Sequence, residues 1–185
     1  MGDLDETIAA PRRADVVALL ETARLTVRLL TEDDAPFMLA LLNEPSFIQN
    51  IGDREVRTID DARGYIAKGP MASYARHGFG LFLVELKAPL SSIGICGILK
   101  RDELPEPDIG FAFLPAYWSQ GYARESAIAV RDYARDAIGL PRLLAIVRPS
   151  NANSIRLLER LGFGFTSVTR LTPEAHEVKL YTCAL

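Results

Sequence analysis

The chain has 185 residues and a formal net charge of -3, with 49% hydrophobic and 24% charged residues. This length suits one domain with a full hydrophobic core, and the composition is ordinary for a globular protein. The slightly acidic balance argues against a general nucleic-acid-binding protein, which needs a basic face, and no apolar run approaches the ~20 residues of a membrane span.

Cysteine and histidine usage gives no indication of a metal site or a disulfide. Cys96 and Cys183 lie far apart without metal-ligand spacing, and His77 and His176 are isolated from each other. Each cysteine is therefore expected to be a small buried residue. The first residues are acidic and lack the basic-then-apolar layout of a secretion signal, so we expect a cytoplasmic protein.

The beginning of the chain is its least regular part. Residues 1–20 are interpreted as an extension, flexible or carrying a short helix over 14–20, and residues 21–185 as a single domain. Within that domain, residues 24–29 alternate in the manner of a strand. Two leucines and a valine share one face of this strand, and two arginines and a threonine share the other.

Two helices and a loop are expected before the main strands. Thr31, followed by three acidic residues, predicts a helix start, and the apolar residues over 37–42 are interpreted as a core-facing stripe. Residues 45–55 are expected to form a loop. Thr58 opens a second helix, which the Gly-Pro pair at 69–70 is expected to interrupt.

The middle of the chain has the order strand, turn, glycine-bearing step, helix. An apolar run over 108–114 leads into a turn at 115–119, and helical patterning covers 124–138. The first amides of a helix lack partners and favour an anion, while Gly121 and Ala123 leave room for a phosphate. We interpret the step as a pyrophosphate cradle, with an ordinary strand-to-helix turn as the alternative. A Walker loop and a G-x-G-x-x-G fingerprint are both missing.

The last third of the chain continues with strand and helix. Residues 142–147 predict a buried strand, Ser150 or Asn151 is placed to cap the next helix, and Gly162 is a good stop signal for it. The order of elements suits a mixed, mostly antiparallel sheet with helices on both faces. The predicted strands cover residues 24–29, 81–86, 93–99, 108–114, 142–147, 163–171 and 178–183.

Three motifs carry a resemblance to a known family. They are Trp118-Ser119-Gln120-Gly121-Tyr122-Ala123, Asn151-x-x-Ser154 and Leu161-Gly162-Phe163. In this order and spacing they resemble the GNAT superfamily of N-acetyltransferases, and within it the RimJ/RimL-type ribosomal-protein N-terminal acetyltransferases, from about residue 21 to the C-terminus. The resemblance implies an α/β fold of the α+β type. Its central sheet would be mixed and mostly antiparallel, with about seven strands splayed in the middle and helices on both faces.

The resemblance also implies an activity. The protein would be an acetyl-CoA-dependent N-acetyltransferase that acetylates a primary amine, either a protein N-terminal α-amine or a small-molecule amine, by direct attack in a ternary complex. Neither a metal nor a nucleic-acid or membrane partner is implied. The oligomeric state is left open, with a homodimer as one alternative. The alternative function is a non-catalytic acyl-CoA-binding or interaction protein on the same fold.

Cofactor contacts follow from the resemblance together with the chemistry of helix termini. Backbone amides of the cradle would bind the pyrophosphate, and the Arg124 side chain could add a charge-assisted contact or be merely solvated. The pantetheine arm would pair with an exposed strand edge, where an amide would polarise the thioester. Asn151 resembles the family residue that contacts the cofactor arm. The expected cofactor-binding residues are Ala112, Phe113, Leu114, Gln120, Gly121, Tyr122, Ala123, Arg124, Asn151 and Ser154.

The expected catalytic residues are Asp108 and Ser154. Asp108 stands where the resemblance places a glutamate, and its carboxylate could act through a water, bind the incoming ammonium, or simply pair with an arginine at the strand end. Many family members use a tyrosine to protonate the departing thiolate, and Leu158 occupies that position here. The resemblance therefore carries this role to Ser154, which could equally act only as a helix cap.

Acceptor contacts are implied for the early helical region, because that region lines the acceptor cleft in GNAT enzymes. The candidates are Phe47, Asn50, Arg54, Tyr65 and Tyr74, each with a purely structural alternative. Loops 45–57 and 68–78 would set the identity of the acceptor, and the sequence does not decode them.

Overall fold

A computed structural model describes residues 18–185, in which eight strands form one sheet in the order β1-β2-β3-β4-β5-β6-β8-β7. The strands are β1 (Ala18–Glu21), β2 (Leu25–Leu29), β3 (Leu81–Lys87), β4 (Leu90–Leu99), β5 (Asp108–Phe113), β6 (Arg142–Val147), β7 (Gly164–Thr169) and β8 (Val178–Ala184). The helices are α1 (Ala35–Leu42), α2 (Pro45–Asn50), α3 (Ile59–Ile66), α4 (Ala72–His77), α5 (Tyr122–Tyr133) and α6 (Ala152–Arg160).

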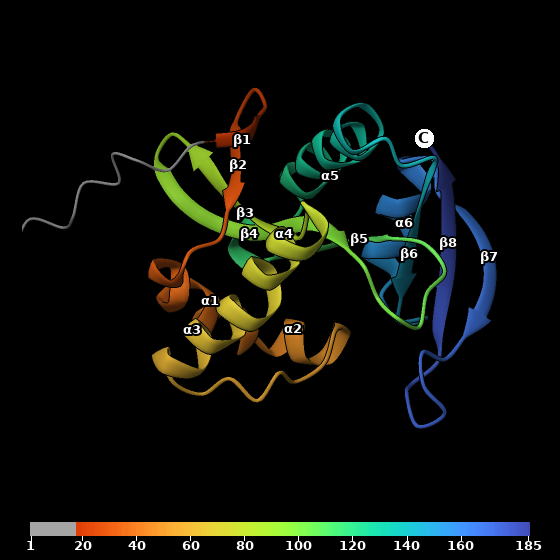
Figure 1. Ribbon diagram of the computed structural model, residues 1–185, viewed down its shortest axis with the longest axis horizontal. Helices are drawn as coiled ribbons and strands as arrows, with labels where there is room; N and C mark the ends of the chain where they lie inside the picture. The colour runs from red at the N-terminus through yellow and green to blue at the C-terminus, as the bar shows by residue number, and fades with distance from the viewer. Residues whose placement is uncertain (1–17) are drawn as a thin grey trace, which may run out of the picture.

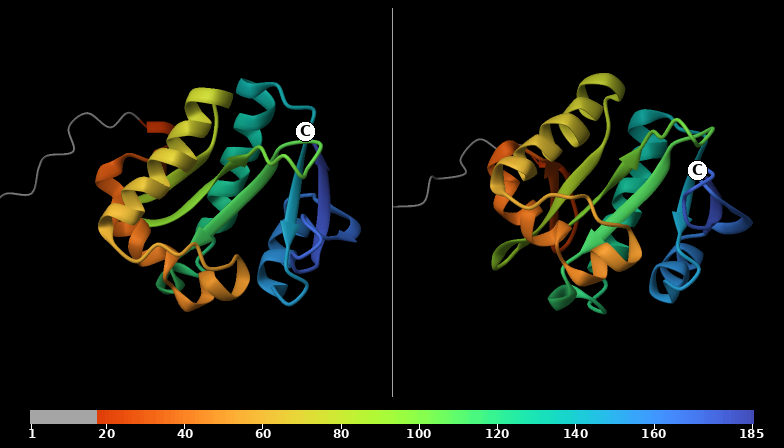
Figure 2. Two further views of the ribbon diagram at one scale, coloured as in Figure 1. Left: turned by 60° about the horizontal axis from the view of Figure 1, so that its bottom comes forward. Right: turned by 90° about the horizontal axis from the view of Figure 1, so that it is seen from below.

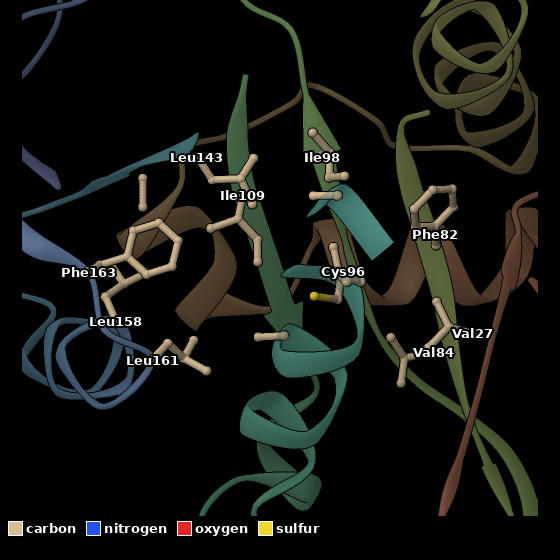
Figure 3. Packing of buried hydrophobic residues seen from close by; sticks show 14 of the residues in the cluster. Val27, Phe82, Val84, Cys96, Ile98, Ile109, Leu143, Leu158, Leu161 and Phe163 are labelled. Atoms are coloured by element: carbon tan, nitrogen blue, oxygen red, sulfur yellow. The ribbon is translucent and has the colours of Figure 1, made fainter. Parts of the chain in front are cut away.

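Helices cover both faces of the sheet, with α1–α3 on one side and α5 on the other (Figure 1). Two apolar clusters fill the space between the layers. The cluster under α5 and α6 includes Ile109 and Phe113, and its packing is drawn in Figure 3. The cluster under α1–α3 includes Ile95, with Ala112 and Leu114 packed against it. Strand β5 therefore presents alternate side chains to the two layers, as an extended strand must.

The sheet divides between β5 and β6, the one parallel pair of neighbours among the described strands. Only Asp108 and Leu144 pair across this boundary, through a hydrogen bond of 2.9 Å from the Leu144 N–H to the Pro107 carbonyl. Strands β4 and β5 pair along six positions, and so do β6 and β8. Figure 2 shows β5 and β6 diverging toward their C-terminal ends. The predicted fold, including the central splay, is confirmed.

Two expectations about the first half of the chain are wrong. Residues 18–20 lie in strand β1, an eighth strand that pairs with β2, and not in a helix over 14–20; residues 1–17 lie outside the described chain. Residues 45–50 form helix α2 within the expected 45–55 loop. Pro45 begins this helix because a proline at the first helical position has a suitable φ and no N–H that needs a partner.

The helix boundaries also differ in detail from the expectation. The Gly-Pro pair at 69–70 does not interrupt the chain's helical course, because a π-helical turn over 67–71 joins α3 to α4. Helix α5 begins at Tyr122 and not at residue 124, and a second π-helical turn extends it to Ile138. The start of α3 is as expected, with Thr58 and Asp61 forming a reciprocal capping box.

A buried charge cluster joins the first strands to the helical layer. Arg28 is only 2% exposed, and its guanidinium lies 2.7 Å from the Asp34 carboxylate and 2.8 Å from the Glu85 carboxylate. The alternation in β2 placed Arg28 on a polar face and Leu29 on the apolar face, but Leu29 is 42% exposed. Both faces of β2 are thus covered near residue 28, and the arginine is retained there because two carboxylates neutralise it.

The Arg28 cluster should dominate the stability of the N-terminal half. Arg28→Met keeps a long apolar side chain but removes the positive charge shared by two buried carboxylates, so we expect a loss of about 3–5 kcal/mol in the free energy of unfolding. Urea denaturation measures this quantity. Arg63→Gln, which removes an exposed pair with Asp60, is the control and should change it by less than about 1 kcal/mol. Similar values for the two variants would contradict the assignment.

Candidate functional site

A cleft of about 1050 Å³ opens where β5 and β6 diverge. Its walls come from these two strands, the first turns of α5 and α6, helix α2, and the connection between β7 and β8. The splay therefore gathers segments that are distant in the sequence around one space (Figure 2). Most of the residues singled out from the sequence line this cleft; those that do not are Leu114, Gln120, Tyr65 and Tyr74.

The residues whose backbone faces the free edge of β5 differ from those expected from the sequence. Leu114 donates its N–H to the Ile93 carbonyl at 3.0 Å, so Leu114 faces β4. Because backbone groups alternate sides along an antiparallel strand, Ala112 also faces β4, whereas Phe111 and Phe113 face the gap. Of the three residues expected at the exposed edge, only Phe113 presents its backbone there, and Phe111 joins it. The Trp118 indole donates to the Phe113 carbonyl at 2.7 Å and anchors the following turn.

The start of α5 is an open helix N-terminus facing the same cleft. Gly121 is its N-cap with φ +85, a left-handed conformation that favours glycine, and no side chain among residues 18–185 caps the helix. The first hydrogen bond of the helix runs from the Glu125 N–H to the Gly121 carbonyl. The amides of Tyr122, Ala123 and Arg124 therefore have no acceptor within the helix and are available to an anion. Gln120 does not line the cleft, and its side chain donates to a backbone carbonyl of the preceding turn.

Arg24 holds this helix start in place, a role that the sequence did not reveal. Its guanidinium donates to the Glu125 carboxylate at 2.8 Å and to the Gln120 carbonyl at 3.0 Å. It also lies 4.4 Å from the centre of the Tyr122 ring, within the range of a cation–π contact. Thr22 adds a hydrogen bond of 2.6 Å to Glu125. The turn between β1 and β2 thus fixes the cradle from outside the cleft.

Asp108 is the buried acid of the cleft. It is 1% exposed, and its carboxylate accepts a hydrogen bond of 2.9 Å from Arg101 Nε. Burial raises the pKa of the Asp108 carboxyl to about 6, and the nearby Arg101 opposes this rise without cancelling it. The arginine pairing that the sequence left open is therefore present, and the same carboxyl keeps a pKa suited to proton transfer near neutral pH.

The start of α6 forms the opposite wall. Asn151 is the N-cap, and its side-chain oxygen accepts the Ser154 N–H at 3.1 Å, which decides between Ser150 and Asn151 as the cap. Within residues 18–185, the Ser154 hydroxyl makes no hydrogen bond, and Ser154 lines the cleft. Leu158 is 2% exposed and belongs to the apolar cluster under α5 and α6. Ser154 thus supplies a free hydroxyl on this wall.

The expected acceptor residues separate into two groups. Phe47, Asn50 and Arg54 line the cleft from α2 and the loop after it. Tyr65 packs against the cluster under α1–α3, and burial raises the pKa of its hydroxyl. Tyr74 uses its hydroxyl to bond backbone groups of neighbouring segments, and its ring stacks on a phenylalanine of β3 at 5.7 Å. The structure therefore brings three of the five candidates to the cleft wall.

Several lining residues were not found from the sequence. His176 and its neighbours reach the cleft from the connection between β7 and β8, and Arg101 reaches it from the connection between β4 and β5. Arg148, Arg156 and Arg160 come from the end of β6 and from α6. No periodicity or motif marks these residues, because the splay alone brings their loops together. In the described part of the chain, no cluster of three or more His, Cys, Asp or Glu residues could hold a metal, and no helix could span a membrane.

Comparisons with known proteins agree with this geometry. Residues 24–164 match the family model of the acetyltransferase (GNAT) domain. An uncharacterized N-acetyltransferase of Bacillus subtilis, YoaA, is 29% identical over 154 residues, which cover 82% of this chain and 86% of that protein.

Solved structures share the fold. An acetyltransferase from Agrobacterium tumefaciens is 26% identical, with a TM-score of 0.74 and 100% coverage of both chains. A RimL ribosomal-protein alpha-N-acetyltransferase in complex with coenzyme A is 16% identical, with a TM-score of 0.78 over 91% of this chain and 98% of that one. At this identity the likeness to RimL concerns the fold alone.

The raised pKa of Asp108 predicts a pH dependence of stability. The carboxyl has an ordinary pKa of 3.8 in the unfolded chain and about 6 in the folded one, so the folded state binds more protons between these values. Its contribution is fully present below 3.8 and is lost as the pH rises through 6. Relative to wild type, Asp108→Asn should therefore gain about 2 kcal/mol of unfolding free energy between about pH 4 and pH 7.

Urea denaturation of both proteins at the two pH values measures this difference. The control is Glu103→Gln, an exposed acid near Asp108, which should change the unfolding free energy by no more than about 0.5 kcal/mol at either pH. An Asp108→Asn effect of the same size at both pH values would show that the pKa of Asp108 is not raised.

Proposed function

The chain belongs to the acetyltransferase (GNAT) family and is an acetyl-CoA-dependent N-acetyltransferase, and from this premise we propose that it acetylates a primary amine by direct attack in a ternary complex. One observation carries the proposal: the uncapped N-terminus of α5 and the unpaired edge of β5 open into the same cleft as the buried Asp108. An anion site, an amide-pairing edge and a proton acceptor are thereby combined in one space.

The residues present fit acetyl-CoA. The free amides of Tyr122, Ala123 and Arg124 suit a pyrophosphate, and the exposed Arg124 guanidinium adds positive charge beside them. The N–H of Phe113 and the backbone groups of Phe111 suit the amides of a pantetheine arm, because an extended chain can pair with an exposed strand edge. The Phe113 carbonyl already accepts the Trp118 indole N–H. When bound, acetyl-CoA supplies the thioester carbonyl that the amine attacks.

We assign separate roles in proton transfer to Asp108 on β5 and to Ser154 on α6. Asp108 accepts a proton from the acceptor ammonium, directly or through a water, so that the amine becomes nucleophilic. A free N–H on the β5 edge polarises the thioester carbonyl. The Ser154 hydroxyl on α6 donates to the departing thiolate. Asn151 orients Ser154 by accepting its backbone N–H, and it also lines the cleft that would hold the cofactor arm.

The acceptor is proposed at the level of chemistry. A protein N-terminal α-amine and a small-molecule amine both remain proposals, and Phe47, Asn50 and Arg54 are the contacts that we assign to them. A cytoplasmic location and a homodimer stay predictions. A non-catalytic acyl-CoA-binding protein is the alternative function, and turnover of acetyl-CoA with an amine distinguishes the two.

A carboxylate at the α5 N-cap should abolish cofactor binding. Gly121→Asp places a negative charge beside the amides of residues 122–124, so the dissociation constant of acetyl-CoA should rise by about 100-fold or more, as measured by titration calorimetry. Gly139→Asp is the matched control, because Gly139 also has a left-handed φ of +77 but lies outside the cleft. Equal effects of the two variants would indicate backbone strain instead of repulsion of a pyrophosphate.

The role of Asp108 predicts the pH profile of catalysis. Because the carboxylate must be ionised to accept a proton, kcat/KM should rise with pH through a limb centred near 6. Asp108→Asn should lower kcat by about 100-fold or more and remove this limb. Asp108→Glu keeps a carboxylate, so it should retain part of kcat and a pH-dependent limb. Steady-state release of CoA thiol at several pH values gives the profile. An Asn variant that keeps the limb would exclude Asp108 as the titrating base.

A further inference from the structure

The cleft is strongly basic, although the chain as a whole is acidic. Among the described residues that line it, the only carboxylate is that of Asp108. Six arginines share the lining: Arg54, Arg101, Arg124, Arg148, Arg156 and Arg160. The net charge of the chain is -3. A basic cleft in an acidic protein indicates that the bound molecules carry several negative charges.

These arginines are not all near the phosphate cradle. Arg124 lies in the first turn of α5, directly beside the free amides. Asp108 lies an even number of residues from Ala112 and Leu114, so the three side chains point to the same face of β5. This is the face covered by α1–α3, opposite α5. Arg101 bonds Asp108, and Arg54 lies in the loop between α2 and α3. Arg54 and Arg101 therefore lie across β5 from the cradle, on the acceptor side of the cleft.

Both acceptor-side arginines have unused hydrogen-bonding capacity. Within residues 18–185, Arg54 makes no hydrogen bond or ion pair, and Arg101 uses only its Nε, on Asp108. Both arginines line the same cleft as Asp108, and Arg101 is in direct contact with its carboxylate. Among the side chains that line this side of the cleft, Arg54 and Arg101 exceed Asp108 by one positive charge when Asp108 is ionised and by two when it is protonated. Glu103, the exposed acid near Asp108, does not line the cleft.

This arrangement disfavours a polycationic acceptor. A polyamine would bring its further positive charges toward two arginines that a single carboxylate cannot neutralise, and like charges at short range are repulsive. An acceptor with one amine and one anionic group would instead give both the acid and the arginines a partner of opposite charge. Its amine would meet Asp108, and its anion would meet the guanidinium groups, which bind carboxylates and phosphates with paired donors.

We propose that the acceptor is an anionic primary amine, carrying a carboxylate or a phosphate beside its amino group, which Arg54 and Arg101 bind while Asp108 faces the amine. The proposal rests on the proposed acetyltransferase function and names the substrate class of the same site. Arg54 is a specificity residue in this scheme, because it contacts the anion and not the reacting nitrogen. Arg101 both binds the anion and positions the Asp108 carboxylate.

Matched pairs of amines test the proposal. Initial rates of CoA thiol release are measured with L-alanine against L-alaninamide, and with O-phosphoethanolamine against ethanolamine. We expect kcat/KM to be at least about tenfold higher for the anionic member of at least one pair, the scale of one charge-assisted hydrogen bond. The amino group of L-alaninamide is the less basic of its pair, so a preference for L-alanine would not come from a larger fraction of neutral amine. The pair that shows the preference identifies the carboxylate or the phosphate as the recognised anion.

Variants at Arg54 connect the preference to the structure. Arg54→Gln should raise KM for the anionic amine about tenfold, raise KM for its neutral counterpart by a clearly smaller factor, and leave the dissociation constant of acetyl-CoA unchanged. Arg54→Lys should retain part of the preference, because it keeps the charge but not the paired donors. Arg76→Gln removes an exposed arginine of α4 outside the cleft and should change none of these quantities.

The outcomes separate this proposal from the function on which it rests. Turnover of neutral and anionic amines with equal kcat/KM would overturn the anionic acceptor and leave the acetyltransferase assignment intact. Equal losses for both amines in Arg54→Gln would do the same, because they would show a structural role for Arg54. A protein that binds acetyl-CoA but turns over neither member of either pair would contradict the direct acetylation of simple anionic amines. Failure to bind acetyl-CoA would count against the proposed function itself.

Discussion

The site depends on the single backbone pairing between β5 and β6. A sheet that continued to pair beyond Asp108 and Leu144 would close the gap and satisfy both strand edges internally. Instead, each strand is held by its outer neighbour and by its own apolar packing, so the two halves diverge while the core stays continuous. The unpaired amides left along the gap are costly unless a ligand or water satisfies them. The division of the sheet is thus what creates the binding site.

Two buried groups of carboxylates and arginines have different roles in this protein. At the N-terminal side, two carboxylates surround Arg28, and the cluster locks β2 and β3 to the helical layer. In the cleft, Asp108 has one direct arginine partner and is buried, so its pKa rises to about 6. The first group surrounds Arg28 with two carboxylates, which raise its pKa despite burial, whereas the second leaves a carboxyl that can change its protonation state near pH 6. Similar side chains therefore serve stability in one place and chemistry in the other.

Local patterns anticipated most of the fold and part of the site. The segment around Gly121 runs from strand through turn and glycine to helix. It could be predicted because each of these steps has its own local signal, and in the structure it lies at the cleft. Helix α2 was missed because Pro45 also suits a loop, and β1 was missed because four residues carry little periodicity. The burial of Arg28 was not anticipated, because alternation in β2 could not show that Asp34 and Glu85 would surround its side chain.

The sequence by itself determined most of the order of elements and the cradle glycine, because helix termini and turns depend on neighbouring residues. The family resemblance pointed to Asp108, Asn151 and Ser154. Only the tertiary structure decided that Phe111 shares the open edge, that Arg24 secures the cradle, and that Arg101 lines the same cleft as Arg54. These relations join segments between about thirty and a hundred residues apart. They exist because the sheet splits between β5 and β6, and no local pattern encodes where two distant strands cease to pair.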